Sequence, residues 1–200
     1  MKKSSLFIAL LLQGASLSFA LDLTPKTYEV PTSNGMSRTR FYFVDGDGKY
    51  TVNTNVHTKV SGQRGETVFS FERLQGATLL IKISPHQPDL EFGDQELETY
   101  RKTAASFTPA GAVRKGDQEE VSNAFFIEGR SSHGFVSSYT IPGSTIRQSV
   151  TFLNLTPKQQ IILVTTAFAT EFEAAQKQSA QIIDSWHKIS DTDLNGPLIN

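Results

Sequence analysis

Cysteine is absent from the 200 residues of this sequence. The fold is therefore built without disulfides, and no lipid can be attached at a lipobox cysteine. Basic clusters are absent too: 19 Lys and Arg stand against 20 Asp and Glu, and RTR at 38 to 40 is the densest basic patch. Nucleic-acid binding needs a basic face that displaces counterions. The composition excludes that class of function.

Long hydrophobic runs are also missing. The apolar run LFIALLL at 6 to 12 is shorter than the roughly 20 residues that span a membrane. It follows Lys2 and Lys3 and precedes Ser18-Phe19-Ala20, the pattern of a signal peptide with its cleavage site. We expect residues 1 to 20 to be removed after Ala20. The mature protein is then periplasmic or secreted and is not an integral membrane protein.

Motifs of enzymes and metal sites do not occur either. No HxH or HExxH pair joins the four histidines, which we interpret as surface and turn residues, and no GxSxG elbow is present. The sequence therefore predicts a non-enzymatic protein with no catalytic residue, metal ligand or cofactor. The alternative is an envelope hydrolase whose site is assembled only by folding. The histidines are His57, His86, His133 and His187.

The first half of the chain is rich in strand patterns. Residues 21 to 40 carry two prolines and read as an extended N-terminal arm with little structure of its own. Alternating apolar residues then predict strands, separated by short turns. We expect a single domain over residues 41 to 190, after which 191 to 200 form a flexible tail. The predicted strands of this half are 41 to 44, 49 to 60, 67 to 74 and 77 to 84.

The stretch VDGDGKY at 44 to 50 suggests either a cation loop or a tight turn. In an EF-hand loop counted from Asp45, Lys49 would stand at a ligand position, Tyr50 where glycine is needed and Val56 where glutamate is needed. Asp-Gly between two strands is instead a strong hairpin signal, since glycine accepts a positive φ. We expect a hairpin here.

The second half adds two helices around a meander. Apolar steps of three and four predict a helix over 95 to 107 with Asp94 as its N-cap, and a second helix from a Thr170–Glu173 capping box to Ile189. Short connections between the intervening strands require antiparallel neighbours. The fold class is therefore α+β, with an antiparallel sheet flanked by helices. These strands are 120 to 130, 134 to 142, 145 to 155 and 160 to 169.

The stretch ILVTTAFATEFEAAQKQSAQIIDSW at 162 to 186 resembles the PsbP-like and DcrB-like families. In those families a Thr/Ala-rich strand end leads into a phenylalanine-bearing helix that closes on Ile-x-x-Ser-aromatic. The resemblance implies an α/β/α sandwich around an antiparallel sheet, in proteins that are often exported and are usually binding or assembly factors.

Aromatic residues supply the candidate site. Phe41 and Phe43 share one face of a strand and Tyr42 points the other way, while Phe125 and Phe126 form a similar pair. They belong to the core if the sheet is covered on both faces, or they line a partner groove if part of a face is open. We expect an exported factor of the bacterial envelope that engages a protein or envelope component through such a groove.

Overall fold

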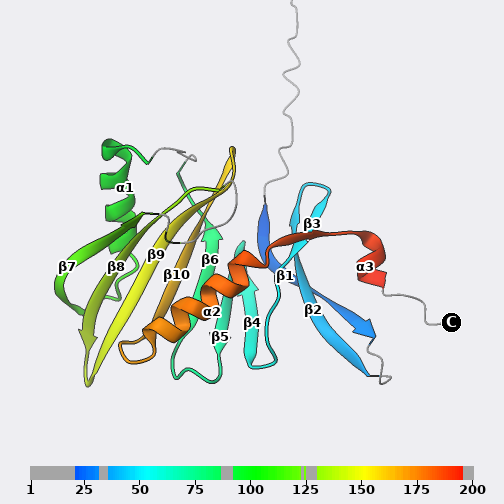
Figure 1. Ribbon diagram of the computed structural model, residues 1–200, viewed down its shortest axis with the longest axis horizontal. Coiled ribbons are helices and arrows are strands. Elements are labelled where there is room, and N and C mark those ends of the chain that lie inside the picture. Colours follow the sequence, from blue (N-terminus) through cyan, green and yellow to red (C-terminus); the bar gives the residue numbers. More distant parts are fainter. Residues whose placement is uncertain (1–20, 32–35, 87–91, 123, 125–129, 196–200) are drawn as a thin grey trace, which may run out of the picture.

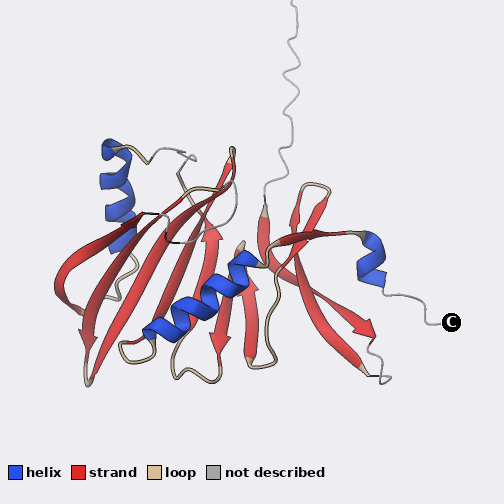
Figure 2. Cartoon of the chain, viewed as in Figure 1, coloured by secondary structure: helices blue, strands red, loops and turns tan. Residues whose placement is uncertain are grey.

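The computed structural model describes residues 21–31, 36–86, 92–122, 124 and 130–195, which form two antiparallel sheets and three helices (Figures 1 and 2). The expected signal peptide, Phe125 and Phe126 lie outside the described residues. The α+β class predicted from the sequence is confirmed.

The larger sheet has seven strands in the order β4-β5-β6-β10-β9-β8-β7, and each neighbouring pair is antiparallel. Its second half has the antiparallel strand order of the predicted meander, but the first strand, predicted over 120 to 130, lies earlier in the chain at Val113–Ser122. The strands are β4 (Thr58–Gln63), β5 (Glu66–Phe71), β6 (Thr78–Ile83), β7 (Val113–Ser122), β8 (Ser132–Ile141), β9 (Ser144–Thr156) and β10 (Gln159–Phe168).

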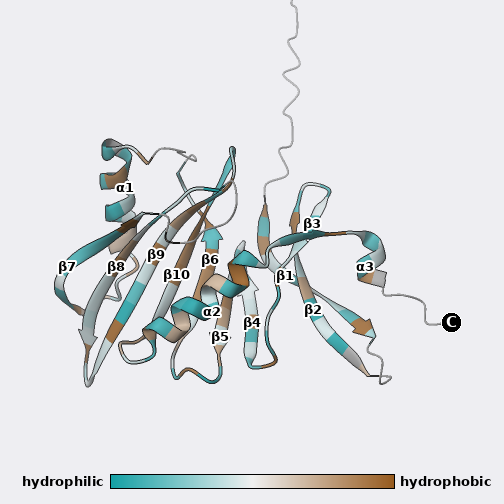
Figure 3. Ribbon diagram, in the orientation of Figure 1, coloured by the Kyte–Doolittle hydropathy of each residue, from teal (hydrophilic) through white to brown (hydrophobic). Residues whose placement is uncertain are grey.

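Helices cover both faces of this sheet, α1 (Asp94–Ala105) on one and α2 (Phe172–Asp184) on the other. The central strand β10 alternates between them, since Ile161 and Leu163 belong to the core under α2 while Ile162 and Val164 belong to the core under α1. In Figure 3 β10 carries hydrophobic stretches, whereas the edge strand β7 is largely hydrophilic. The predicted sandwich is confirmed for this sheet.

A second sheet was not predicted. Its four strands run in the order β1-β2-β3-β11, and its inner face packs against the larger sheet, where Phe41 lies edge-on to Phe69 at 5.8 Å between ring centroids. Phe41 and Phe43 share that buried face, as expected, and Tyr42 faces Tyr28 on the other. The strands are β1 (Asp22–Pro31), β2 (Ser37–Asp45), β3 (Gly48–Thr51) and β11 (His187–Ile189).

The prediction of an arm with little structure over residues 21 to 40 was wrong. This segment forms β1 and the start of β2, and it buries Leu21 and Leu23 in the core shared by the two sheets. Its prolines are compatible with an edge strand, because Pro25 lies at a break in the pairing register and Pro31 is the last residue. The Thr67 hydroxyl donates to the Leu23 carbonyl and ties β1 to the larger sheet.

The strand predicted over 49 to 60 is divided between the two sheets. It ends at Thr51, and a new strand begins at Thr58 in the other sheet. Asn55 causes the turn between them, because its Oδ1 accepts hydrogen bonds from the His57 amide at 2.9 Å and the Thr58 hydroxyl at 3.0 Å.

The second helix also differs from the prediction at both ends. Thr170 forms no capping box, since α2 begins at Phe172 without a side-chain cap and Glu173 instead pairs with Arg147. At the other end the Ser185 hydroxyl donates to the Ile182 carbonyl, and residues 187 to 189 leave the helix as β11.

The expected flexible tail also begins with structure. Residues Asp191–Asn195 form the short helix α3, where Asp191 pairs with Lys49.

Replacing Leu23 with alanine tests whether β1 is part of the core. Leu23 is fully buried, so we expect Leu23→Ala to lower the free energy of unfolding by about 2–5 kcal/mol in urea denaturation. The control is Val30→Ala, at the half-buried far end of the same strand, for which we expect less than about 1 kcal/mol. Equal small losses at both positions would show that the segment is a dispensable arm.

Candidate functional site

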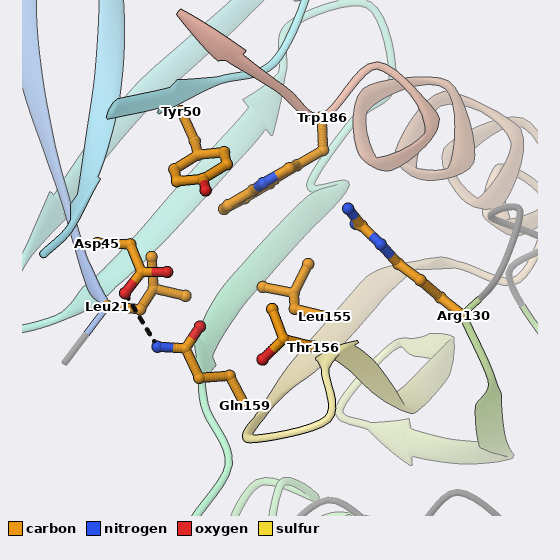
Figure 4. A pocket seen from close by; sticks show the side chains of 8 residues that line it. All are labelled: Leu21, Asp45, Tyr50, Arg130, Leu155, Thr156, Gln159 and Trp186. Carbon is orange, nitrogen blue, oxygen red and sulfur yellow. Dashed lines mark hydrogen bonds between the residues drawn. The ribbon is translucent and has the colours of Figure 1, made fainter. Parts of the chain in front are cut away.

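A pocket of about 80 Å³ opens where the two sheets meet (Figure 4). The smaller sheet contributes Asp45 and Tyr50, and the β9–β10 hairpin of the larger sheet contributes three more residues. We call this space the inter-sheet pocket. Its lining residues are Leu21, Asp45, Tyr50, Arg130, Leu155, Thr156, Gln159 and Trp186.

One wall of the inter-sheet pocket is aromatic. Phe43 and Tyr50 are cross-strand neighbours on β2 and β3, so their side chains share a face of the sheet. Trp186, directly after α2, stacks on Phe43 at 5.2 Å and 11° and lies 6.1 Å from the Tyr50 ring at 28°. The wall is therefore rigid and largely apolar, and a flat ligand group can pack against it.

The charged groups of the pocket stand on two sides of it. Asp45 accepts a hydrogen bond from Gln159 Nε2 at 3.1 Å, and Arg130, two residues before β8, points into the pocket (Figure 4). Burial lowers the pKa of Arg130, while the nearby Tyr50 phenol acts in the opposite direction. Nη1 of Arg130 is buried and has no hydrogen-bond partner among the described residues. The arrangement offers a cation, a carboxylate and an aromatic surface to a small polar ligand.

The structure places the two described candidate residues, Phe41 and Phe43, in different surroundings. Phe43 is fully buried, and it takes part in the inter-sheet pocket only by supporting Trp186. Phe41 is 7% exposed and borders a second, more polar hollow of about 220 Å³. An apolar groove formed by these two rings therefore does not exist, because the larger sheet covers them. The second hollow is lined by Arg38, Thr39, Arg40, Phe41, Val52, Asn53 and Thr54.

Sequence patterns did not reveal the residues that line the inter-sheet pocket. Trp186, the single tryptophan of the chain, entered only as the aromatic residue that closes the family signature, within the helix predicted to reach Ile189. Arg130 stood at the end of a predicted strand with no motif around it. The VDGDGKY stretch does contribute, but through its turn: Asp45 pairs with Gly48, and Gly46 takes a φ of 58° as a two-residue hairpin requires.

The histidines do not line either hollow. His133 was expected in a surface turn, but it is buried in β8 between the rings of Phe92 and Phe135, and its Nε2 lies 2.9 Å from Glu120 Oε1. Strand β8 begins two residues earlier than predicted, which moves His133 from the turn into the sheet. Among the described residues no group of three His, Asp or Glu side chains is placed to hold a metal ion.

His86 lies beside a side-chain hydroxyl, which is the arrangement of a general base and a nucleophile in many enzymes. Its Nε2 lies 2.9 Å from Thr103 Oγ1, and its ring packs against Tyr100 and Phe152 under α1. This contact belongs to the core around α1 and not to a pocket that admits a substrate. Burial lowers the pKa of His86, so the folded protein favours the neutral ring.

Stability should therefore depend on pH through His86. Its pKa is lower in the folded than in the unfolded chain, so its contribution is complete above about pH 6.5 and is lost as the pH falls toward the folded pKa. We expect the unfolding free energy of His86→Gln to fall less than that of the wild type between about pH 7.5 and 5, measured by urea denaturation. Each unit of pKa difference is worth about 1.4 kcal/mol. The exposed His187→Gln variant should follow the wild type, and parallel curves for His86→Gln and the wild type would contradict the expectation.

Comparison with known proteins gives similarities of fold. The structure of LpqN, involved in cell envelope biogenesis of Mycobacterium tuberculosis, matches with 12% identity and a TM-score of 0.46, over 83% of this chain and 92% of LpqN. The solution structure of a cyanobacterial PsbP from Synechocystis matches with 12% identity and a TM-score of 0.40, over 88% of this chain and 96% of that one. No protein-family model and no curated protein matches the chain.

Among the described residues no helix is both long and apolar enough to cross a bilayer.

Proposed function

We propose that this protein is an exported, non-enzymatic binding or assembly factor of the bacterial cell envelope. It engages a protein or envelope component at the inter-sheet pocket, in place of the groove expected from Phe41, Phe43, Phe125 and Phe126. Export rests on the Lys2-Lys3, apolar-run and Ser-Phe-Ala pattern of residues 1 to 20, with cleavage after Ala20.

The observation that supports binding is the composition of the inter-sheet pocket. The stacked wall of Trp186 and Tyr50 provides apolar contact area, and Arg130 and Asp45 provide polar contacts of opposite charge. An apolar lining with a few placed polar groups is typical of ligand sites, and the volume of about 80 Å³ restricts what enters to a small group. A hydrolase with a side-chain nucleophile needs that nucleophile in hydrogen-bond contact with a base. In this pocket Asp45 contacts Gln159, and the Thr156 hydroxyl accepts from the Lys158 amide.

Crosslinking from the rim of the pocket tests this proposal. A photoreactive residue replaces Thr156, which is exposed beside the pocket, and the control carries it at Asp117 on the edge strand β7. With bacterial envelope extract we expect an adduct at position 156 that is absent at position 117. The captured component, once purified, should change the fluorescence of Trp186, the only tryptophan of the chain.

A second variant links the adduct to the pocket itself. Gln159→Trp places a large side chain in the pocket and should reduce the adduct at position 156 about tenfold, the effect of losing about 1.4 kcal/mol of binding free energy. Circular dichroism checks that this variant folds. Equal adducts at positions 156 and 117, or a captured component that leaves Trp186 fluorescence unchanged, would contradict binding at the pocket.

A further inference from the structure

Arg130 lacks the ion pairs that two other arginines of the larger sheet region form. Arg101 pairs with Glu98 at 3.1 Å and Glu120 at 2.7 Å, and Arg147 pairs with Glu173 at 3.1 Å. None of the ion pairs among the described residues involves Arg130, and its Nη1 atom is buried without a hydrogen bond. A buried N–H group without a hydrogen-bond partner lowers the stability of a fold. A native structure that keeps such a group needs an explanation, and a ligand that accepts hydrogen bonds from the same side chain is one explanation.

The carboxylate in the same pocket does not neutralise Arg130. Asp45 lies across the pocket, where it accepts from Gln159, and no contact joins it to the guanidinium (Figure 4). An ionised carboxylate has about four acceptor positions, so Asp45 can accept further hydrogen bonds. The inter-sheet pocket thus has guanidinium N–H donors of Arg130 on one side, apart from those of the buried Nη1, and carboxylate acceptors on the other. A complementary ligand carries an anionic group and a hydrogen-bond donor.

We infer that Arg130 binds the carboxylate of the pocket's ligand, an inference that rests on the proposed binding function. The planar guanidinium matches a carboxylate with two parallel hydrogen bonds. Asp45 places a second negative charge in a space of only about 80 Å³, which disfavours a phosphate dianion relative to a carboxylate monoanion. The amine or amide next to the carboxylate then donates to Asp45. Free amino acids and the carboxyl end of a polypeptide share this chemistry.

Titration with small probes, followed through Trp186 fluorescence, tests the inference. The probes are glycine, triglycine, glycine methyl ester and inorganic phosphate. We expect a saturable response to a carboxylate probe and none to the ester or to phosphate. A response to triglycine alone identifies the end of a chain as the source of the carboxylate, and a response to both glycine and triglycine identifies the free amino acid as sufficient.

Two arginine variants make the titration specific. Arg130→Gln should weaken carboxylate binding at least about tenfold, because hydrogen bonds to charged groups are among the strongest polar contacts. The matched control is Arg114→Gln, on the exposed edge strand β7, and its affinity should equal that of the wild type. Equal affinities for Arg130→Gln and the wild type, tighter binding of phosphate than of the carboxylates, or no saturable response would overturn the inference.

Stability distinguishes a binding role of Arg130 from a structural one. Arg130→Met removes the unpaired charge and keeps the length of the side chain, so the melting temperature should stay the same or rise by about 2–4 °C. A fall of that size would show that the guanidinium supports the fold and would overturn the inference.

The role of Arg130 and the proposed binding function can be contradicted separately. If the Thr156 adduct persists in Arg130→Gln, the carboxylate inference fails alone. If the wild type gives neither an adduct nor a response to the probes, the proposed binding function fails with it.

Discussion

The stacking of Trp186 on Phe43 is the contact on which the site depends. Trp186 follows a helix that covers the larger sheet, and Phe43 lies in the second strand of the smaller one. The Ser185 hydroxyl accepts a hydrogen bond from the Asn53 amide at 2.7 Å, and β11 then pairs with β3. Ring stacking and main-chain pairing thus hold the two sheets together at one place. The inter-sheet pocket exists because side chains from both sheets reach this junction without filling it.

The polar groups of the junction are arranged for a partner more than for stability. Among the described residues Nη1 of Arg130 is buried without a hydrogen bond, and buried side-chain atoms of Gln118 and Gln176 also lack a partner. Of these groups only Arg130 lines the inter-sheet pocket. Functional sites often keep groups that a purely structural design would remove or pair. The position of Arg130 in the pocket wall is the reason for assigning the site to it.

Much of the fold was predictable because its signals are local. The helix over Asp94–Ala105, the strands β8 to β10 and the hairpin at Asp45 follow from hydrophobic period, short connections and an Asp-Gly turn. The division into two sheets was not predictable, because it depends on which strands, distant in the sequence, pair with each other. The prolines of residues 21 to 40 favoured an arm in the sequence analysis, but β1 tolerates them because it is an edge strand.

The site was less predictable than the fold. Its residues come from five separate parts of the chain, and no motif connects them. These parts are the residue before β1, the β2–β3 hairpin, the segment before β8, the β9–β10 hairpin and the residues after α2. The aromatic pattern of β2 indicated which rings share a face, and that expectation was correct for Phe41 and Phe43. It could not indicate that a second sheet turns the face into core. That Arg130 forms no ion pair with the described carboxylates is visible only in the structure.

The most direct measurement of the central claim is the NMR signal of the Arg130 side-chain Nε–H group, assigned by comparison with Arg130→Lys. The account predicts that the signal of the ligand-free protein shows no strong hydrogen bond to a carboxylate. It also predicts that addition of a carboxylate probe shifts this signal and slows its exchange with water, while the signal of Arg114 is unchanged. A ligand-free signal already typical of a paired guanidinium, or a signal that no carboxylate shifts, would contradict the account.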